Sequence, residues 1–309
     1  MAEFALRPLS LGELLDRAFT IFRRRFGAIL VVLVACLIIP SLMLLNNIKT
    51  FTDMAQLAQP GGSPQEQTQL MFALFGKLAW LVVVFSVALL IARTALGWIA
   101  HKTMLGEETD AMTALTQAFK LFFPMLGLLF VEAGIIILAE IVLYIPMAIF
   151  GIGAMGAAGG KPGVAFGVGM VIWLVAYFIA ILYVMAALFV TTSSLVAEAD
   201  TGVFKAIERS WSLTKGRRGA IIGAMLMVYV LLWIVMFGVS VAVGVGMGMA
   251  GKGAESAGGM MLALFGGVIL FSLAVSGYYF VLQMVTYYDL RVRKEGLDLE
   301  LASAAMPPA

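Results

Sequence analysis

Residues 10–30 read SLGELLDRAFTIFRRRFGAIL, a stretch that changes from an amphipathic pattern to an almost purely apolar one. On a helix, the apolar side chains from Leu11 to Phe26 fall on one face and the charged side chains fall on the other. Ser10 followed by Glu13 is a capping box, which marks the start of that helix. The stretch therefore predicts a helix lying in the membrane interface, followed from Phe26 by a helix that enters the bilayer.

The composition of the whole chain agrees with a membrane protein. Apolar residues make up 62% of the 309 residues and charged residues 12%, whereas a soluble domain has roughly 45–50% and about 25%. The net charge is only +2, so charge gives no reason to expect a nucleic-acid partner. A single cysteine, Cys36, excludes an internal disulfide, and a single histidine, His101, excludes any site that needs two.

Long apolar stretches predict an all-α, polytopic protein with about six transmembrane helices. The predicted spans are residues Phe26–Leu45, Leu78–Ile99, Met125–Phe150, Val164–Leu188, Ala220–Met249 and Met260–Tyr287. An even number of spans places both termini on one side. The N-terminal segment, the second and fourth connections and the tail hold most of the Lys and Arg residues. The positive-inside rule therefore predicts that both termini are cytoplasmic.

The opening pattern recurs before the third and fifth spans. Segments beginning at Thr109 and Thr201 each open on a hydroxyl residue suited to N-capping and then run through an amphipathic stretch into a span. Within one membrane domain covering 1–309, this predicts three repeats at 9–100, 109–192 and 201–288, each an interfacial helix plus a hairpin, and a cytoplasmic tail at 289–309. Chance recurrence of a common entry helix is the other interpretation.

Three segments resemble one bacterial family. The opening LSLGELLDRAFTIFRRRFGAIL (9–30), RSWSLTKGRRGAIIGAML (209–226) and YYDLRVRKEGLDLE (287–300) are similar to the glycerophosphoryl diester phosphodiesterase membrane-domain proteins. In relatives of that family, a similar membrane region is fused to a soluble phosphodiesterase barrel with a histidine pair and acidic metal ligands. The resemblance implies a protein of the bacterial inner membrane that corresponds to the membrane region alone, without the catalytic barrel.

Ionisable residues inside predicted spans are functional candidates. Arg93 lies about 12 Å from the cytoplasmic end of the second span and Glu132 about 15 Å into the third. The two spans are consecutive and run in opposite directions, so the matching depths predict an intramembrane ion pair. Glu140 lies about 12 Å nearer the outer face, without an evident partner. A structural pair that fixes helix register and a proton or substrate relay through Glu132 and Glu140 are both open interpretations.

Basic clusters flank the span ends and are candidates for contact with anionic lipid headgroups, although topology alone also explains them. They comprise Arg23, Arg24, Arg25, Lys215, Arg217, Arg218, Arg291, Arg293 and Lys294.

The sequence contains no recognisable catalytic or metal-binding set, since one histidine and one cysteine cannot complete one. We therefore expect a non-enzymatic protein without a cofactor or bound metal. Its expected role is a membrane scaffold or accessory subunit that contacts lipid at the cytoplasmic face and has a protein partner. The alternative is a transporter or channel for a small solute or lipid that uses Arg93, Glu132 and Glu140.

Overall fold

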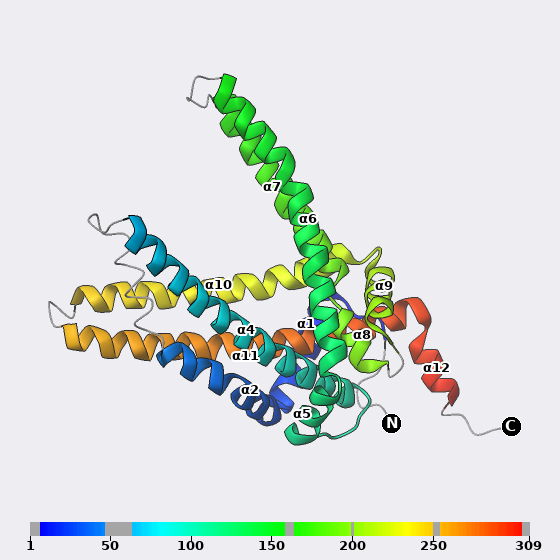
Figure 1. Cartoon of the computed structure of the whole chain (residues 1–309). Coiled ribbons are helices and arrows are strands. Elements are labelled where there is room, and N and C mark those ends of the chain that lie inside the picture. The colour runs from blue at the N-terminus through cyan, green and yellow to red at the C-terminus, as the bar shows by residue number, and fades with distance from the viewer. Residues whose placement is uncertain (1–6, 47–63, 158–163, 199–200, 250–253, 305–309) are drawn as a thin grey trace.

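The computed structural model describes residues 7–46, 64–157, 164–198, 201–249 and 254–304, and these residues are helical with short connections (Figure 1). The all-α class predicted from the sequence is confirmed for this part of the chain. The helices are α1 (Leu11–Arg24), α2 (Phe26–Asn46), α4 (Pro64–Met104), α5 (Ala111–Lys120), α6 (Phe122–Ala157), α7 (Val164–Ala187), α8 (Thr191–Ala197), α9 (Val203–Thr214), α10 (Arg218–Met249), α11 (Ala254–Glu295) and α12 (Leu297–Ala304).

Five helices of the described part are long and apolar enough to cross a membrane. The qualifying stretches are Phe26–Met43, Met71–Met104, Phe122–Ile149, Phe166–Ala197 and Arg218–Ala242. They coincide with the first five predicted spans. The sixth predicted span, Met260–Tyr287, lies on α11, but the side chains of residues 254–274 are outside the described ones. The structure thus supports a membrane protein and leaves the sixth crossing as a prediction.

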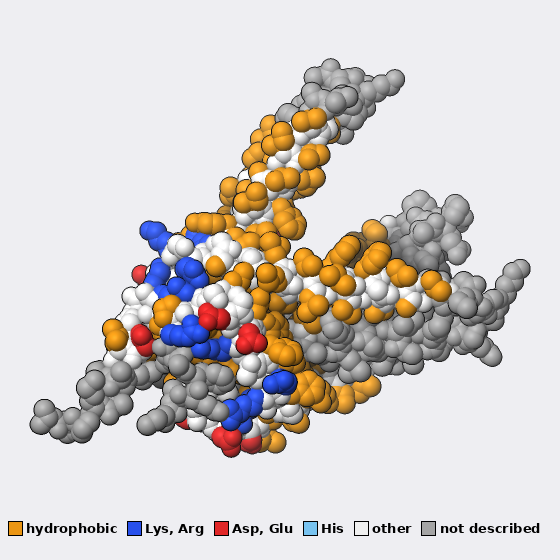
Figure 2. Space-filling model, turned by 180° about the vertical axis from the view of Figure 1, so that it is seen from behind, with side chains coloured by type: hydrophobic (Ala, Val, Ile, Leu, Met, Phe, Trp, Pro, Cys, Tyr) orange, Lys and Arg blue, Asp and Glu red, His pale blue; other side chains and the backbone are white. Residues whose placement is uncertain are grey.

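The long helices extend from a common base in two directions (Figure 1). Helices α2, α4, α10 and α11 extend to one side of this base, which we call the hub, while the α6–α7 hairpin projects away from them. The short helices α1, α5, α8 and α9 gather at the hub. Charged side chains lie on the hub surface, and hydrophobic side chains cover the projecting helices (Figure 2). This division is the one expected if the projections lie in lipid and the hub faces water.

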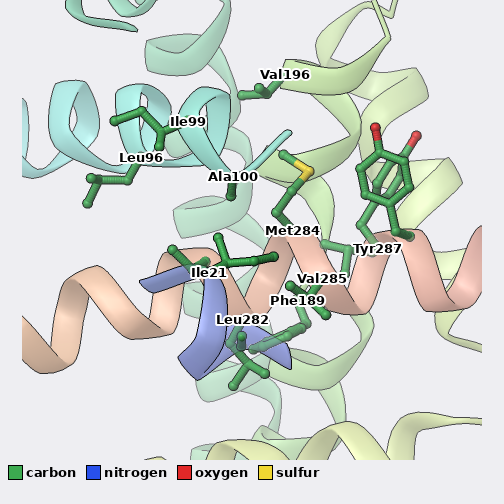
Figure 3. Close-up of a cluster of buried hydrophobic side chains, with 14 of the residues drawn as sticks. Ile21, Leu96, Ile99, Ala100, Phe189, Val196, Leu282, Met284, Val285 and Tyr287 are labelled. Atoms are coloured by element: carbon green, nitrogen blue, oxygen red, sulfur yellow. The ribbon is translucent and has the colours of Figure 1, made fainter. Parts of the chain in front are cut away.

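The hydrophobic core lies inside the hub, where α11 passes between the other elements (Figure 3). Leu282 and Met284 of α11, Leu96 of α4 and Ile21 of α1 are all fully or almost fully buried there. The approach is closest at Gly277, where a Cβ atom would lie 3.1 Å from a methyl carbon of Ile29. A glycine at this position lets α11 pack directly against α1 and α2.

The starts of the three predicted interfacial helices agree only in part with the sequence analysis. The capping box of α1 is confirmed, because the Ser10 side chain accepts from the Glu13 backbone N–H and the Glu13 carboxylate accepts from the Ser10 backbone N–H. The hydroxyl caps expected at Thr109 and Thr201 are wrong. Asp110 caps α5, and α9 begins after Gly202 without a side-chain cap. In both cases the helix begins one residue later than the hydroxyl suggested.

We call α1, α5 and α9 the collar helices, and they share one burial pattern. In each, a small buried residue is followed directly by an exposed aromatic residue. The small residues are Ala18 (0% exposed), Ala118 (1%) and Ser210 (0%), and the aromatic residues are Phe19 (52%), Phe119 (62%) and Trp211 (44%).

The burial pattern also corrects the expectation that the apolar face of each amphipathic helix simply rests on lipid. Leu14, Ala18 and Ile21 of α1 are buried in the hub core of the protein itself. Of the apolar residues of α1, Phe19 at the border of that face is the one that stays exposed. The amphipathic pattern is the same for a helix on a membrane and a helix on a protein core, so hydropathy alone could not separate the two.

Candidate functional site

The structure brings together the two intramembrane residues predicted to pair. Nη2 of Arg93 on α4 lies 3.2 Å from Oε2 and 3.3 Å from Oε1 of Glu132 on α6. The two side chains retain exposures of only 19% and 12%. Because a charge at this depth is costly without a partner, the ion pair holds α6 against α4 in one register.

A third group completes this contact. The hydroxyl of Thr191, the first residue of α8, lies within hydrogen-bond distance of two acceptors, Oε1 of Glu132 and the carbonyl oxygen of Leu188, which share its one proton. Three helices therefore meet at one carboxylate. Nε of Arg93 is buried without a hydrogen-bond partner among the described residues, so the guanidinium keeps one donor that this cluster does not use.

The sequence analysis missed α8, which follows directly after α7. All six residues from Thr191 to Val196 are buried. The chain can turn there because Ser210 of α9 replaces missing backbone partners: its hydroxyl donates to the carbonyl oxygen of Ala187 at 2.7 Å and accepts from the Val190 N–H at 3.3 Å. The hydroxyl run TTSS at 191–194 was the available signal, since four such residues are unusual at the end of an apolar span.

Glu140 does not belong to this cluster. It is exposed on α6, eight residues after Glu132, and it has no ion-pair or hydrogen-bond partner within the part of the chain that is described. At 1.5 Å per residue, about 12 Å separates the two carboxylates along the helix. The structure thus gives no support to a direct relay between Glu132 and Glu140.

The basic cluster at the end of α11 is largely engaged within the chain. Arg291 donates to Glu295 at 2.8 Å, and Glu295 also binds Arg209 of α9 at 2.9 Å. Arg209 in turn pairs with Glu198, whose carboxylate also accepts from the hydroxyl of Tyr287. This network joins α8, α9 and α11 at the hub surface.

Electrostatic interactions favour the charged forms of Glu198 and Arg209, which lie at the centre of this network. Burial alone would raise the pKa of Glu198, but hydrogen bonds from Tyr287, Arg209 and Thr201 outweigh it and hold the pKa below its usual value. Burial alone would lower the pKa of Arg209, and the carboxylates of Glu198 and Glu295 more than reverse that effect. The pair therefore stays ionised throughout the physiological range.

The ion pair between Asp289 and Arg293 holds the N-terminal segment. Asp289, which is 3% exposed, accepts from the backbone N–H of Leu9 at 2.7 Å and from Nε of Arg293 at 3.0 Å. Nη2 of Arg293 donates to the carbonyl oxygen of the same Leu9. We call this arrangement the Leu9 clasp. Both backbone groups of Leu9 are satisfied by one ion pair 280 residues further along the chain.

Arg218, the first residue of α10, is buried rather than exposed to a lipid headgroup. It is 6% exposed, and its guanidinium carbon lies 4.4 Å from the ring centroid of Tyr183 and 4.3 Å from that of Trp211. No carboxylate lies within ion-pair distance of it among the described residues. The two aromatic faces therefore stabilise its charge through cation–π contacts.

The remaining candidate lipid contacts differ in availability. Arg25 reaches Glu108 at 3.4 Å, and Lys294 donates to the carbonyl oxygen of Ser212. Arg23 and Lys215 are exposed, and Arg217 is half-buried beside α1 and α11. The structure thus assigns Arg291 and Arg293 to ion pairs of the chain itself and leaves Arg23 and Lys215 open to a headgroup.

The grooves described on the surface are apolar. One has a volume of about 680 Å³ and lies between residues Tyr177–Met185 of α7 and Leu226–Met236 of α10. A second, of about 490 Å³, lies between α1, α10 and α11. Glu132 lines neither of them. Among the described residues there is also no group of three or more His, Cys, Asp or Glu side chains that could hold a metal ion.

Comparison with family models, curated proteins and solved structures gives no match to this chain. The resemblance to the glycerophosphoryl diester phosphodiesterase membrane-domain family therefore rests on the three quoted segments.

Proposed function

We propose that this chain is a non-enzymatic scaffold or accessory subunit of the bacterial inner membrane, with both termini in the cytoplasm and with lipid contact through its collar helices. It corresponds in this proposal to the membrane region of the family that its sequence resembles. The observation that carries the proposal is the shared pattern of the collar, in which Ala18, Ala118 and Ser210 anchor each helix to the hub and the next residue presents an aromatic ring outward.

Exposed aromatic residues at the hub border support interfacial contact, because aromatic side chains are enriched where the bilayer meets water. Trp211 is the clearest example, since its ring also stacks on Arg218 at the start of α10. Exposed Lys215 lies close by in sequence and would be attracted to anionic headgroups at roughly 1 kcal/mol. The matched positions in α1 and α5 also favour the interpretation of three related units.

The scaffold role is further supported by the way in which the chain uses its charges. The Arg93–Glu132 pair joins α4 to α6, and the Arg209–Glu198 pair joins α9 to the end of α8. The Arg293–Asp289 pair lies within α11 and binds Leu9 of the N-terminal segment. Their carboxylates are all held in hydrogen bonds within the chain. Meanwhile the spans leave most of their apolar surface uncovered by the chain itself. A rigid base with uncovered apolar helices suits a protein that organises lipid or partner helices.

Depth-dependent fluorescence quenching tests the collar contact. Trp211 would be kept as the only tryptophan, and the chain reconstituted with lipids brominated either near the headgroup or near the acyl-chain end. We expect the lipid brominated near the headgroup to quench Trp211 more strongly. Stronger quenching by aqueous iodide than by either lipid would refute interfacial contact.

A transporter remains the second candidate because Glu132 keeps some exposure and Arg93 keeps an unused donor. Solute flux into liposomes that is lost in Glu132→Gln would favour it. The scaffold proposal expects no flux above that of empty liposomes and a protein that co-purifies with the chain.

A further inference from the structure

The α6–α7 hairpin carries an isolated carboxylate on a surface that the chain does not cover. The hairpin projects from the hub away from α2, α4, α10 and α11 (Figure 1), and its visible surface is dominated by hydrophobic side chains (Figure 2). On this surface Glu140 is exposed, and so are Ile137 and Tyr144, which lie on the same helical face, and the next residue, Ile141, each of them by more than half.

The contrast with Glu132 shows what Glu140 lacks. Both residues lie on α6 within the stretch Phe122–Ile149 that is apolar enough to span a membrane. Glu132 is held by Arg93 and Thr191, whereas Glu140 has no partner among the described residues. An ionised carboxylate at membrane depth is expensive, and such residues almost always pair with another group.

Because Glu140 lacks the counter-charge that Glu132 has, we propose that the face of α6 around Glu140 is a docking site. Its occupant is a transmembrane helix of a partner protein that carries a lysine or arginine at the level of Glu140. The proposal deepens the accessory-subunit role and rests on it, because it gives the chemistry of the partner. Charge complementarity selects the occupant. An acyl chain could cover Ile137 and Ile141, but it offers no counter-charge to Glu140.

The geometry of α6 makes the proposed contact specific. Glu140 lies between Ile137 and Tyr144 along one face, so a helix packed there brings its own side chains to the carboxylate within an apolar border. Tyr144, one turn away, can offer a hydroxyl to the same partner. The basic residue must match the depth of Glu140, because a shift of two turns moves it by about 11 Å.

Photo-crosslinking in liposomes tests the proposal. The full chain, with a benzophenone amino acid in place of Ile141, is reconstituted with a synthetic poly-leucine transmembrane peptide of about 20 residues. One peptide carries a lysine at its centre, one carries the lysine two turns from the centre, and one is neutral. We expect the centred-lysine peptide to crosslink about tenfold more than the neutral one. Benzophenone at Val241, an exposed position on α10, should show no such preference.

Three variants test whether the carboxylate of Glu140 causes the preference for the lysine peptide. Glu140→Gln should lower the yield of the lysine peptide to that of the neutral peptide. Glu140→Lys should reverse the preference in favour of a peptide with a central glutamate. Adding Leu138→Glu to Glu140→Gln restores the charge at nearly the same depth on another face of α6, and the yield should stay low.

Equal yields for the lysine and neutral peptides in the unsubstituted chain would overturn the proposal, as would a preference that survives Glu140→Gln. Equal yields together with solute flux that is lost in Glu140→Gln would instead assign this residue to a relay. Trp211 quenching is measured in the same liposomes. Normal quenching with failed crosslinking therefore removes the docking site while the collar contact stands.

Discussion

Removing the carboxylate of the Leu9 clasp should release the N-terminal helix from the hub. In Asp289→Ala, the buried N–H of Leu9 loses its acceptor, which costs about 1–3 kcal/mol. Arg293 also loses its counter-charge, but its side chain is 26% exposed, so solvent limits this part to about 1 kcal/mol. Together these effects amount to about 3 kcal/mol, or a roughly hundredfold increase in local opening at 1.4 kcal/mol per tenfold change.

Hydrogen exchange followed by mass spectrometry in detergent micelles measures this opening directly. We expect peptides that cover α1 to exchange roughly a hundredfold faster in Asp289→Ala, while peptides from α5 keep their exchange rates. Asp289→Asn retains an acceptor for Leu9 and should show a smaller effect. Glu107→Ala removes an exposed ion pair with Lys102 and serves as the control with little effect. Unchanged exchange of α1 in Asp289→Ala would refute the clasp.

Three further experiments test other contacts. The double variant Arg93→Gln/Glu132→Gln should lose less stability than the sum of the losses in the two single variants. Thermal unfolding should give a coupling free energy of about 1–3 kcal/mol. Additive losses would show that the ion pair is not formed. The stabilisation lost in Glu198→Gln should be constant near neutral pH and shrink below about pH 4, because the pKa of Glu198 is lowered by folding and its contribution disappears on protonation. Gly277→Ala should lower the melting temperature by the equivalent of about 1 kcal/mol through overpacking against Ile29, whereas Gly238→Ala on the open surface of α10 should not lower it; equal behaviour of the two alanine variants would contradict close packing at Gly277.

Hydropathy and depth were sufficient to predict the long helices and one of their contacts. The apolar runs placed five of the spans, because a stretch of some 20 apolar residues has few other stable environments. The contact between Arg93 and Glu132 could be anticipated because their spans are consecutive and antiparallel. On two adjacent antiparallel helices, residues at the same depth lie next to each other in space. Glu140 shows where this reasoning ends, since it has no hydrogen-bond or ion-pair partner in the described part of the chain.

The hub was not predictable in the same way, because its contacts join residues that are distant in sequence. Nothing local indicates that Asp289 binds the backbone of Leu9 or that Ser210 caps the end of α7. An amphipathic pattern also states only that one face avoids water. Whether Leu14 and Ile21 meet lipid or protein depends on α11, which lies more than 230 residues later in the chain.

The position of α11 explains why the three predicted units do not behave as independent hairpins. Its C-terminal half meets α1 and α2 at Gly277, α8 through Tyr287, α9 through Glu295 and the N-terminal segment through Asp289. Each of these contacts covers groups that an earlier unit leaves open. Without the last long helix the hub therefore lacks these contacts, whereas the α6–α7 hairpin projects from the hub and gains little cover from α11. That difference leaves Glu140 uncovered, although Glu132 on the same helix is paired with Arg93, and it is the reason to look for the missing partner on another protein.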